Sequence, residues 1–183
     1  SRNIVALTDL GEYDPAHVLN DTWNTYGGRT PYNKANSLYE TLTQSYPQVR
    51  DIQQTSTVLQ GIGGMDSGED YEKVESARLL SSSEYTLNAA LGYISLRAAL
   101  NQDEVLAVAY EYTYAGQVYQ VGEFSTDGGE SLKAPNALIM KLLKGTNNAP
   151  VKKGKGTWDL MMKNVYSIGA SQMSSDKFEL YIQ

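Results

Sequence analysis

Apolar and polar residues alternate most regularly between residues 105 and 125, in VLAVAYEYTYAGQVYQVGEFS. Alternation at every second position is typical of a β-strand with one face on a core. Residues 115–116, Ala-Gly, divide the stretch and predict a hairpin in which Tyr112 lies opposite Tyr119. A type I′ turn prefers Asn or Asp where this chain has Ala, so the turn type stays open.

The two faces of this predicted hairpin differ in character. The register places Val108 opposite Glu123, and it predicts core packing at the Val105–Val108 end and half-exposure toward Tyr112–Gln117. The other face carries Ala107, Ala109, Glu111, Thr113, Val118, Gln120 and Phe124. The more aromatic face carries Leu106, Val108, Tyr110, Tyr112, Tyr114, Tyr119 and Val121.

The rest of the chain predicts short elements separated by long loops. Helical spacing of apolar residues, or a cap signature, indicates helices over 36–46, 51–59 and 158–169. Apolar or β-branched runs indicate strands over 3–8, 71–80, 84–88, 92–96 and 176–183. The brief apolar run 137–145 fits a buried strand or a short helix, and we favour the strand. Irregular loops are predicted over 9–35, 61–70, 125–136 and 147–157. We therefore expect an α+β fold, with a mainly antiparallel sheet, a few short helices and long irregular loops.

Local signals suggest where the helices begin and end. Ser37 and Glu40 have the spacing of a capping box, and Pro47 ends that helix. Asp51 is the expected cap of the second helix. In the third, Trp158 and Met162 are predicted to pack into the core.

Composition narrows the classes of function. The chain has 183 residues, a net charge of −6 and no cysteine. The acidic balance argues against nucleic acid, whose phosphates need a basic face, and the lack of cysteine excludes disulfides and thiolate metal sites. Because the chain starts and stops inside strand-like segments, we expect residues 1–183 to be a single soluble domain cut from a much larger protein. Tyrosine outnumbers phenylalanine fourteen to two, which is typical of half-exposed sheet faces.

Candidate chemistry is sparse. His17 is the single histidine and lacks the partners of a triad or a multi-histidine metal site. The Gly-rich stretch 61–68 lacks the G-K-[ST] ending of a phosphate loop. The densest carboxylate cluster could serve a hydrolase, if two members converge in a cleft, or a loose calcium site; it comprises Asp66, Glu69, Asp70, Glu72 and Glu75. We expect no catalytic, cofactor-binding or metal-binding residue and no cofactor.

Two groups of residues are candidates for docking a partner. Lys152, Lys153 and Lys155 form the one concentrated basic patch, which could meet an acidic surface. Tyr112, Tyr114 and Tyr119 form the wet end of the aromatic face. The same tyrosines could instead stack on sugars, which leaves a cell-surface carbohydrate-binding module as the alternative function.

Four stretches carry a family resemblance: IVALTDLGEYDP (4–15), SSEYTLNAALGYISL (82–96), the hairpin 105–125 and WDLMMKNVYSIG (158–169). They resemble the SprA/Sov family, very large outer-membrane proteins of the type IX secretion system and gliding machinery in Bacteroidota. The resemblance runs over most of the chain.

The resemblance implies a function without catalysis. Family members are single-chain β-barrel translocons that pass folded proteins with a C-terminal signal domain outward, with a lateral PorV-type partner and a periplasmic plug. By this resemblance the chain is a non-enzymatic soluble domain of such a translocon, periplasmic or capping, in the cell envelope. Its expected partners are the other parts of the parent barrel, PorV-type and plug proteins and the secreted proteins.

Overall fold

A computed structural model describes residues 1–10, 30–147 and 157–162. It is an α+β fold, as the sequence predicts, built on a four-stranded sheet with the order β2-β1-β8-β5. The strands are β1 (Arg2–Leu7), β2 (Tyr71–Ala77), β5 (Leu106–Val108) and β8 (Leu138–Lys144). β8 runs parallel to β1, and the other two pairings are antiparallel.

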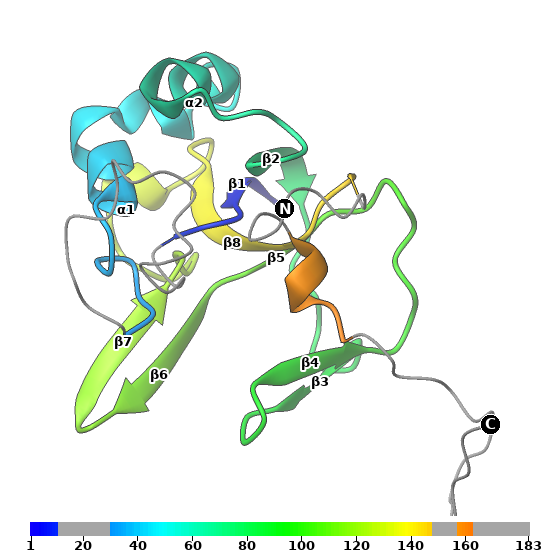
Figure 1. Cartoon of the computed structure of the whole chain (residues 1–183). Helices are drawn as coiled ribbons and strands as arrows, with labels where there is room; N and C mark the ends of the chain where they lie inside the picture. The colour runs from blue at the N-terminus through cyan, green and yellow to red at the C-terminus, as the bar shows by residue number, and fades with distance from the viewer. Residues whose placement is uncertain (11–29, 148–156, 163–183) are drawn as a thin grey trace, which may run out of the picture.

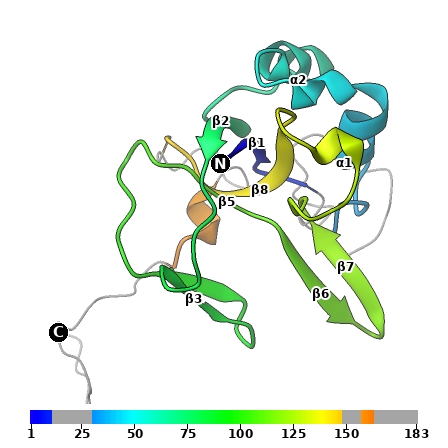
Figure 2. The same ribbon diagram turned by 180° about the vertical axis from the view of Figure 1, so that it is seen from behind.

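Two further antiparallel hairpins leave this sheet as separate arms (Figure 1). One consists of β3 (Tyr85–Asn88) and β4 (Tyr93–Leu96), and the other of β6 (Tyr110–Tyr114) and β7 (Gln117–Val121). The view from behind shows the same two arms extending from the same end of the molecule, apart from each other (Figure 2). The predicted strands over 3–8, 71–80, 84–88, 92–96 and 137–145 are thus confirmed, although β2 ends at Ala77 rather than at residue 80.

A chain of short helices covers one face of the sheet. It consists of α1 (Leu38–Glu40), a π-helical turn (Thr41–Ser45), a 3₁₀ turn (Pro47–Arg50) and α2 (Thr55–Gly63). Their apolar side chains meet those of the sheet in one core, which contains Val5, Leu7, Leu10, Leu38, Leu42, Val49, Ile52, Leu59, Met65, Tyr71, Val121, Ala137 and Ile139. β1 lies between two other strands, and Ile4 to Leu7 are all buried, so its continuous apolar run suits a central strand.

Both helix caps differ in detail from the prediction. The Ser37 side chain makes no capping bond, so no capping box forms; instead Asn36 Oδ1 accepts a hydrogen bond from Leu38 N at 3.0 Å. The second helix begins at Thr55 rather than Asp51, because residues 51–54 first form a turn in which Asp51 Oδ1 accepts from Gln53 N at 3.0 Å.

The hairpin register is confirmed in the arm and wrong at its base. Tyr112 lies opposite Tyr119, but Val108 pairs with Lys141 of β8 and not with Glu123. The chain bends between β5 and β6, so β5 joins the main sheet while Glu123 turns into the core. β5 is an edge strand, and its residues are half-buried rather than core as predicted.

Two backbone features shape this arm. Ala115 and Gly116 have φ of 50° and 77°, the left-handed values of a type I′ turn, whose twist suits a two-residue hairpin. Gly122 has φ of 75°, and a Cβ there would lie 3.1 Å from the Cβ of Ala109. The bend thus brings two strands together at a distance that only glycine permits.

The elements predicted for the C-terminal part of the chain lie only partly within the described residues. Thr157–Leu160 forms a 3₁₀ turn, and Met162 is 58% exposed, so the prediction that Met162 packs into the core is wrong. Leu160 and Met161 are exposed as well, whereas the side chain of Trp158, predicted to pack with Met162, lies outside the described part of the chain. The predicted strand 176–183 and most of the helix 158–169 lie outside the described residues, as do most of the loops 9–35 and 147–157.

Gly122→Ala should lower the free energy of unfolding by about 2 kcal/mol or more, because it combines a left-handed φ with a close contact. Urea unfolding of the full chain measures this loss. Gly128→Ala is the matched control, because nothing lies within 4 Å of a Cβ there and its φ is not left-handed. Equal stability of the two variants would contradict the proposed role of Gly122.

Candidate functional site

The tyrosines of the β6–β7 arm form a continuous aromatic row. The rings of Tyr110 and Tyr112 stack at a centroid distance of 6.3 Å, and those of Tyr112 and Tyr119 at 5.4 Å. Tyr32 adds an edge-to-face contact with Tyr119, also at 5.4 Å. Such pairs are worth about 0.5–1.5 kcal/mol each beyond the area they bury. The row therefore stiffens an arm that would be marginal as two isolated strands.

The segment 31–33 clamps this row to the body of the protein. The hydroxyl of Tyr112 donates to the carbonyl of Pro31 at 2.6 Å. Asn33 N donates to the carbonyl of Gln120 at 2.9 Å. The Asn33 side chain both accepts from Gly122 N at 2.8 Å and donates to Gly122 O at 3.1 Å. Asn33 thus occupies the outer edge of β7 much as a paired strand residue would.

A buried ion pair anchors the base of the arm. Glu123 is 2% exposed and Arg50 5% exposed, and their side chains meet in two hydrogen bonds, of 2.8 Å and 2.5 Å. The Tyr39 hydroxyl and Ile139 N donate to the two Glu123 oxygens at 2.7 Å and 2.8 Å. Arg50 also donates to the carbonyl of Ala137 at 3.1 Å. One carboxylate therefore joins the arm, the helices and β8.

Burial and the Glu123 charge perturb the titration of this cluster. Burial raises the pKa of Tyr39 well above its ordinary value, and the adjacent Glu123 carboxylate raises it further. Burial alone would lower the pKa of Arg50, but the hydrogen bonds and charge of Glu123 outweigh it and raise that pKa. In the arm, burial and the neighbouring Tyr119 raise the pKa of Tyr112.

One predicted docking residue, Tyr114, is exposed to solvent at the tip of the arm. Tyr114 is 64% exposed and Val118 62%, whereas Tyr112 and Tyr119 are half-buried by their mutual stacking. The structure thus brings Tyr112 and Tyr119 together and leaves Tyr114 at the end of the row. The other predicted docking residues, Lys152, Lys153 and Lys155, lie outside the described residues, as does His17.

The predicted acidic cluster is divided among separate structural roles. Glu72 is buried and accepts from Thr146 N at 2.7 Å and Thr146 Oγ1 at 2.6 Å. Asp70 accepts from Asp66 N at 2.9 Å. Within residues 1–10, 30–147 and 157–162, no group of three or more metal-ligating side chains gathers where it could hold an ion. The cluster gives no support to the hydrolase or calcium hypotheses.

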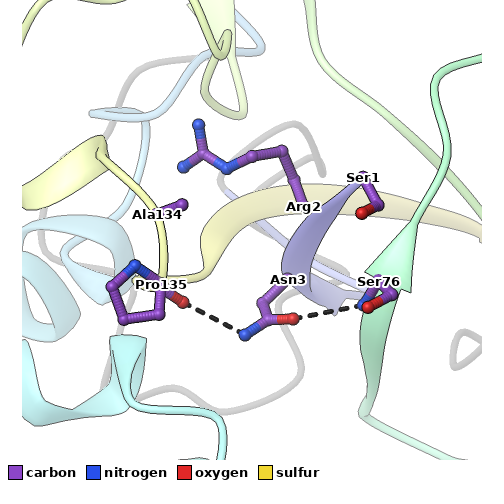
Figure 3. Close-up of a pocket in the computed structure, with 6 residues that line it drawn as sticks. All are labelled: Ser1, Arg2, Asn3, Ser76, Ala134 and Pro135. Atoms are coloured by element: carbon purple, nitrogen blue, oxygen red, sulfur yellow. Dashed lines mark hydrogen bonds between the residues drawn. The ribbon is translucent and has the colours of Figure 1, made fainter.

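A shallow pocket lies beside the first strand (Figure 3). Its lining consists of Ser1, Arg2, Asn3, Ser76, Ala134 and Pro135. Asn3 crosses it, donating to Pro135 O and accepting from Ser76 N, both at 3.1 Å. Arg2 donates to the carbonyls of Leu132 and Asn136. These side chains tie β1 to its neighbours, so the pocket's polar groups serve the fold.

Comparisons of this chain with known proteins found no relative. Family models, curated proteins and solved structures gave no match. In the part of the chain that the structure describes, no helix is long and apolar enough to cross a membrane. The proposed function therefore depends on the residues of the chain itself.

Sequence reasoning missed the Arg50–Glu123 pair. The assumed hairpin register placed Glu123 opposite Val108 at the end of the hairpin, and Arg50 lay between two predicted helices. The one available signal was Gly122, because a glycine directly after an alternating run can mark a bend at which the register ends.

Glu123→Gln should destabilise the protein by about 3–5 kcal/mol, because it leaves the buried Arg50 charge without a counter-ion. Denaturant unfolding at neutral pH measures the effect. Glu84→Gln is the control, since the Arg78–Glu84 pair is exposed and should matter far less. The combined replacement Arg50→Met with Glu123→Leu should recover much of the loss, and equal effects of both Glu variants would contradict a structural role for the buried pair.

The contribution of Tyr39 to the free energy of unfolding should be lost in alkali. Its folded-state pKa is raised above the ordinary value of 10.0, so its contribution is complete below that pH. Above about pH 10 the unfolded chain loses the proton first, and the contribution is lost as pH rises toward the folded pKa. Unfolding free energies from neutral pH to about pH 11 should therefore fall more steeply in the native protein than in Tyr39→Phe. Tyr46→Phe, at a site 38% exposed, should keep the native slope.

Proposed function

We propose that the chain is a non-enzymatic docking domain of an outer-membrane protein translocon of the type IX secretion system. The observation that carries the proposal is the braced aromatic arm, which presents Tyr114 and Val118 at its tip while Glu123 fixes its base. The resemblance of four sequence stretches to the SprA/Sov family supplies the assembly in which this arm would act.

A docking role suits the way the arm is built. Aromatic residues are enriched at the centres of protein interfaces, because they bury a large area at a small cost in side-chain entropy. The stacked row holds its members before a partner arrives, so little further ordering is needed on binding. Tyr114 extends this row into solvent and is the residue that a partner would cover first.

A carbohydrate-binding role is favoured less. A sugar platform needs open ring faces, but Tyr112 lies between the rings of Tyr110 and Tyr119 and donates its hydroxyl to Pro31. The ring of Tyr119 is in turn shared between Tyr112 and Tyr32. Most of the row is therefore already engaged within the protein.

Within the proposed assembly the domain lies in the cell envelope, on the periplasmic or the outer side of the barrel. Its partners are other parts of the parent chain, the PorV-type and plug proteins and the exported proteins that carry a C-terminal signal domain. It supports secretion and gliding by contact rather than by chemistry.

Replacement of Tyr114 and Val118 at the tip of the arm tests the proposed docking role. In the full-length parent protein, Tyr114→Ser with Val118→Ser should reduce export of proteins with a C-terminal signal domain and weaken co-purification of the PorV-type partner. We expect the melting temperature of the isolated chain to stay unchanged, because both residues are exposed. Tyr46→Ser, an exposed tyrosine on the helical side, is the control.

Unchanged export and unchanged complex composition would contradict the proposal. A calorimetric titration of the same variants with glycans separates the alternative. Sugar binding that the native chain shows and the tip variant loses would favour the carbohydrate-binding module.

A further inference from the structure

The β3–β4 arm is a two-stranded sheet that stands apart from the main sheet (Figures 1 and 2). Residues 78–84 lead into it, and four residues, 89–92, join its strands. Two strands alone are marginally stable in water, and a third strand is the usual remedy. The arm has three properties that bear on such pairing: an apolar face, an open backbone edge and a lack of charged side chains.

One face of the arm is apolar along its whole length. The register pairs Tyr85 with Leu96 and Leu87 with Ile94, which places these four side chains on the same face. The opposite face carries Thr86, Asn88, Tyr93 and Ser95. Leu87 is 63% exposed, and none of the four apolar residues belongs to the described core.

Tyr85 and Leu87 of the apolar face also form the open backbone edge of β3. Arg97 N donates to Glu84 O at 2.9 Å, which makes 84 and 97 a hydrogen-bonded pair. Because such pairs alternate along an antiparallel ladder, Tyr85 and Leu87 direct their N–H and C=O groups away from β4. No described residue pairs with these groups.

This edge lacks the protection that two other edges of the protein, those of β2 and β7, have. Natural edge strands usually carry charges or are covered, which prevents unwanted pairing. β2, at the edge of the main sheet, carries Glu72, Lys73 and Glu75, and β7 is met by Asn33. Residues 85–96, by contrast, contain no charged side chain.

We propose that the outer edge of β3 accepts an extended strand from another polypeptide, uncharged and with apolar side chains at alternate positions. The added strand would bond to the backbone of Tyr85 and Leu87 and lay its apolar side chains beside Leu87. β3 is the receiving edge because Thr86 and Leu87 are exposed, whereas Ile94 and Leu96 on β4 are half-buried. This surface is separate from the tyrosine arm and acts whichever assembly the parent chain belongs to.

Two other occupants fit the arm less well. A lipid surface would suit the apolar side chains, but the hydrocarbon interior cannot satisfy the unpaired N–H and C=O groups of an open edge. A second copy of the chain would bring a second net charge of −6, which opposes association. A neutral strand satisfies the edge and the apolar face together.

Amide hydrogen exchange in the full chain, with the synthetic peptide Lys-(Thr-Val)₄-Lys as probe, tests the proposal. Without peptide, the Tyr85 and Leu87 amides should exchange fast, while that of Thr86, inside the ladder, is protected. Saturating peptide should slow Tyr85 and Leu87 roughly tenfold or more. Leu87→Lys, which places a charge on the edge, and Leu87→Pro, which removes an outward N–H, should both abolish the protection at Tyr85.

Val118→Lys is the matched control, because Val118 is 62% exposed on the other arm, and it should retain the effect. Exchange that is slow without peptide, unchanged by peptide, or slowed only in the 110–121 arm would overturn the proposal. Protection that rises with protein concentration alone would assign the edge to a second copy, and protection by neutral phosphatidylcholine vesicles but not by peptide would assign it to lipid. Either result would also overturn it.

Discussion

A carboxylate removed from water must find enough donors to replace its hydration, and Glu123 finds four: two from Arg50, one from Tyr39 and one from Ile139. These donors come from three separate parts of the fold: α1, the 3₁₀ turn Pro47–Arg50 and the internal strand β8. The arrangement is complete only when helices, sheet and hairpin are all in place. The pair therefore specifies how the layers meet, which apolar packing alone leaves less defined.

The bend at Gly122 follows from this requirement. If β7 continued in register, Glu123 would lie opposite Val108 at the rim of the sheet. A left-handed residue before it instead turns the carboxylate inward and directs the preceding strand outward. One glycine thus separates the anchored base of the arm from its exposed tip. The exposed tip and the buried pair are consequences of the same local geometry.

Much of the fold could be predicted from the sequence because it depends on local pattern. Alternation identified the hairpin and its register at Tyr112 and Tyr119, and an unbroken apolar run identified the strand β1. Other features depend on contacts between distant residues, and local pattern carries little of that information. Two examples are the first helix, which is capped by the Asn36 side chain and not by that of Ser37, and the pairing of β5 with β8. Of the docking candidates, Tyr112, Tyr114 and Tyr119 lie on one face as predicted.

The clamp formed by residues 31–33 also determines how the protein carries mechanical load. A pull on the tip of the arm passes along β7 to Gly122, where the Asn33 amide and the Glu123 carboxylate hold the chain at adjacent residues. Asn33 is only five residues from Leu38, the first residue of α1, so the force reaches the helical layer over a short path. The arm then moves as a lever with the whole domain, and displacement at its tip is transmitted to the core rather than absorbed in a loop.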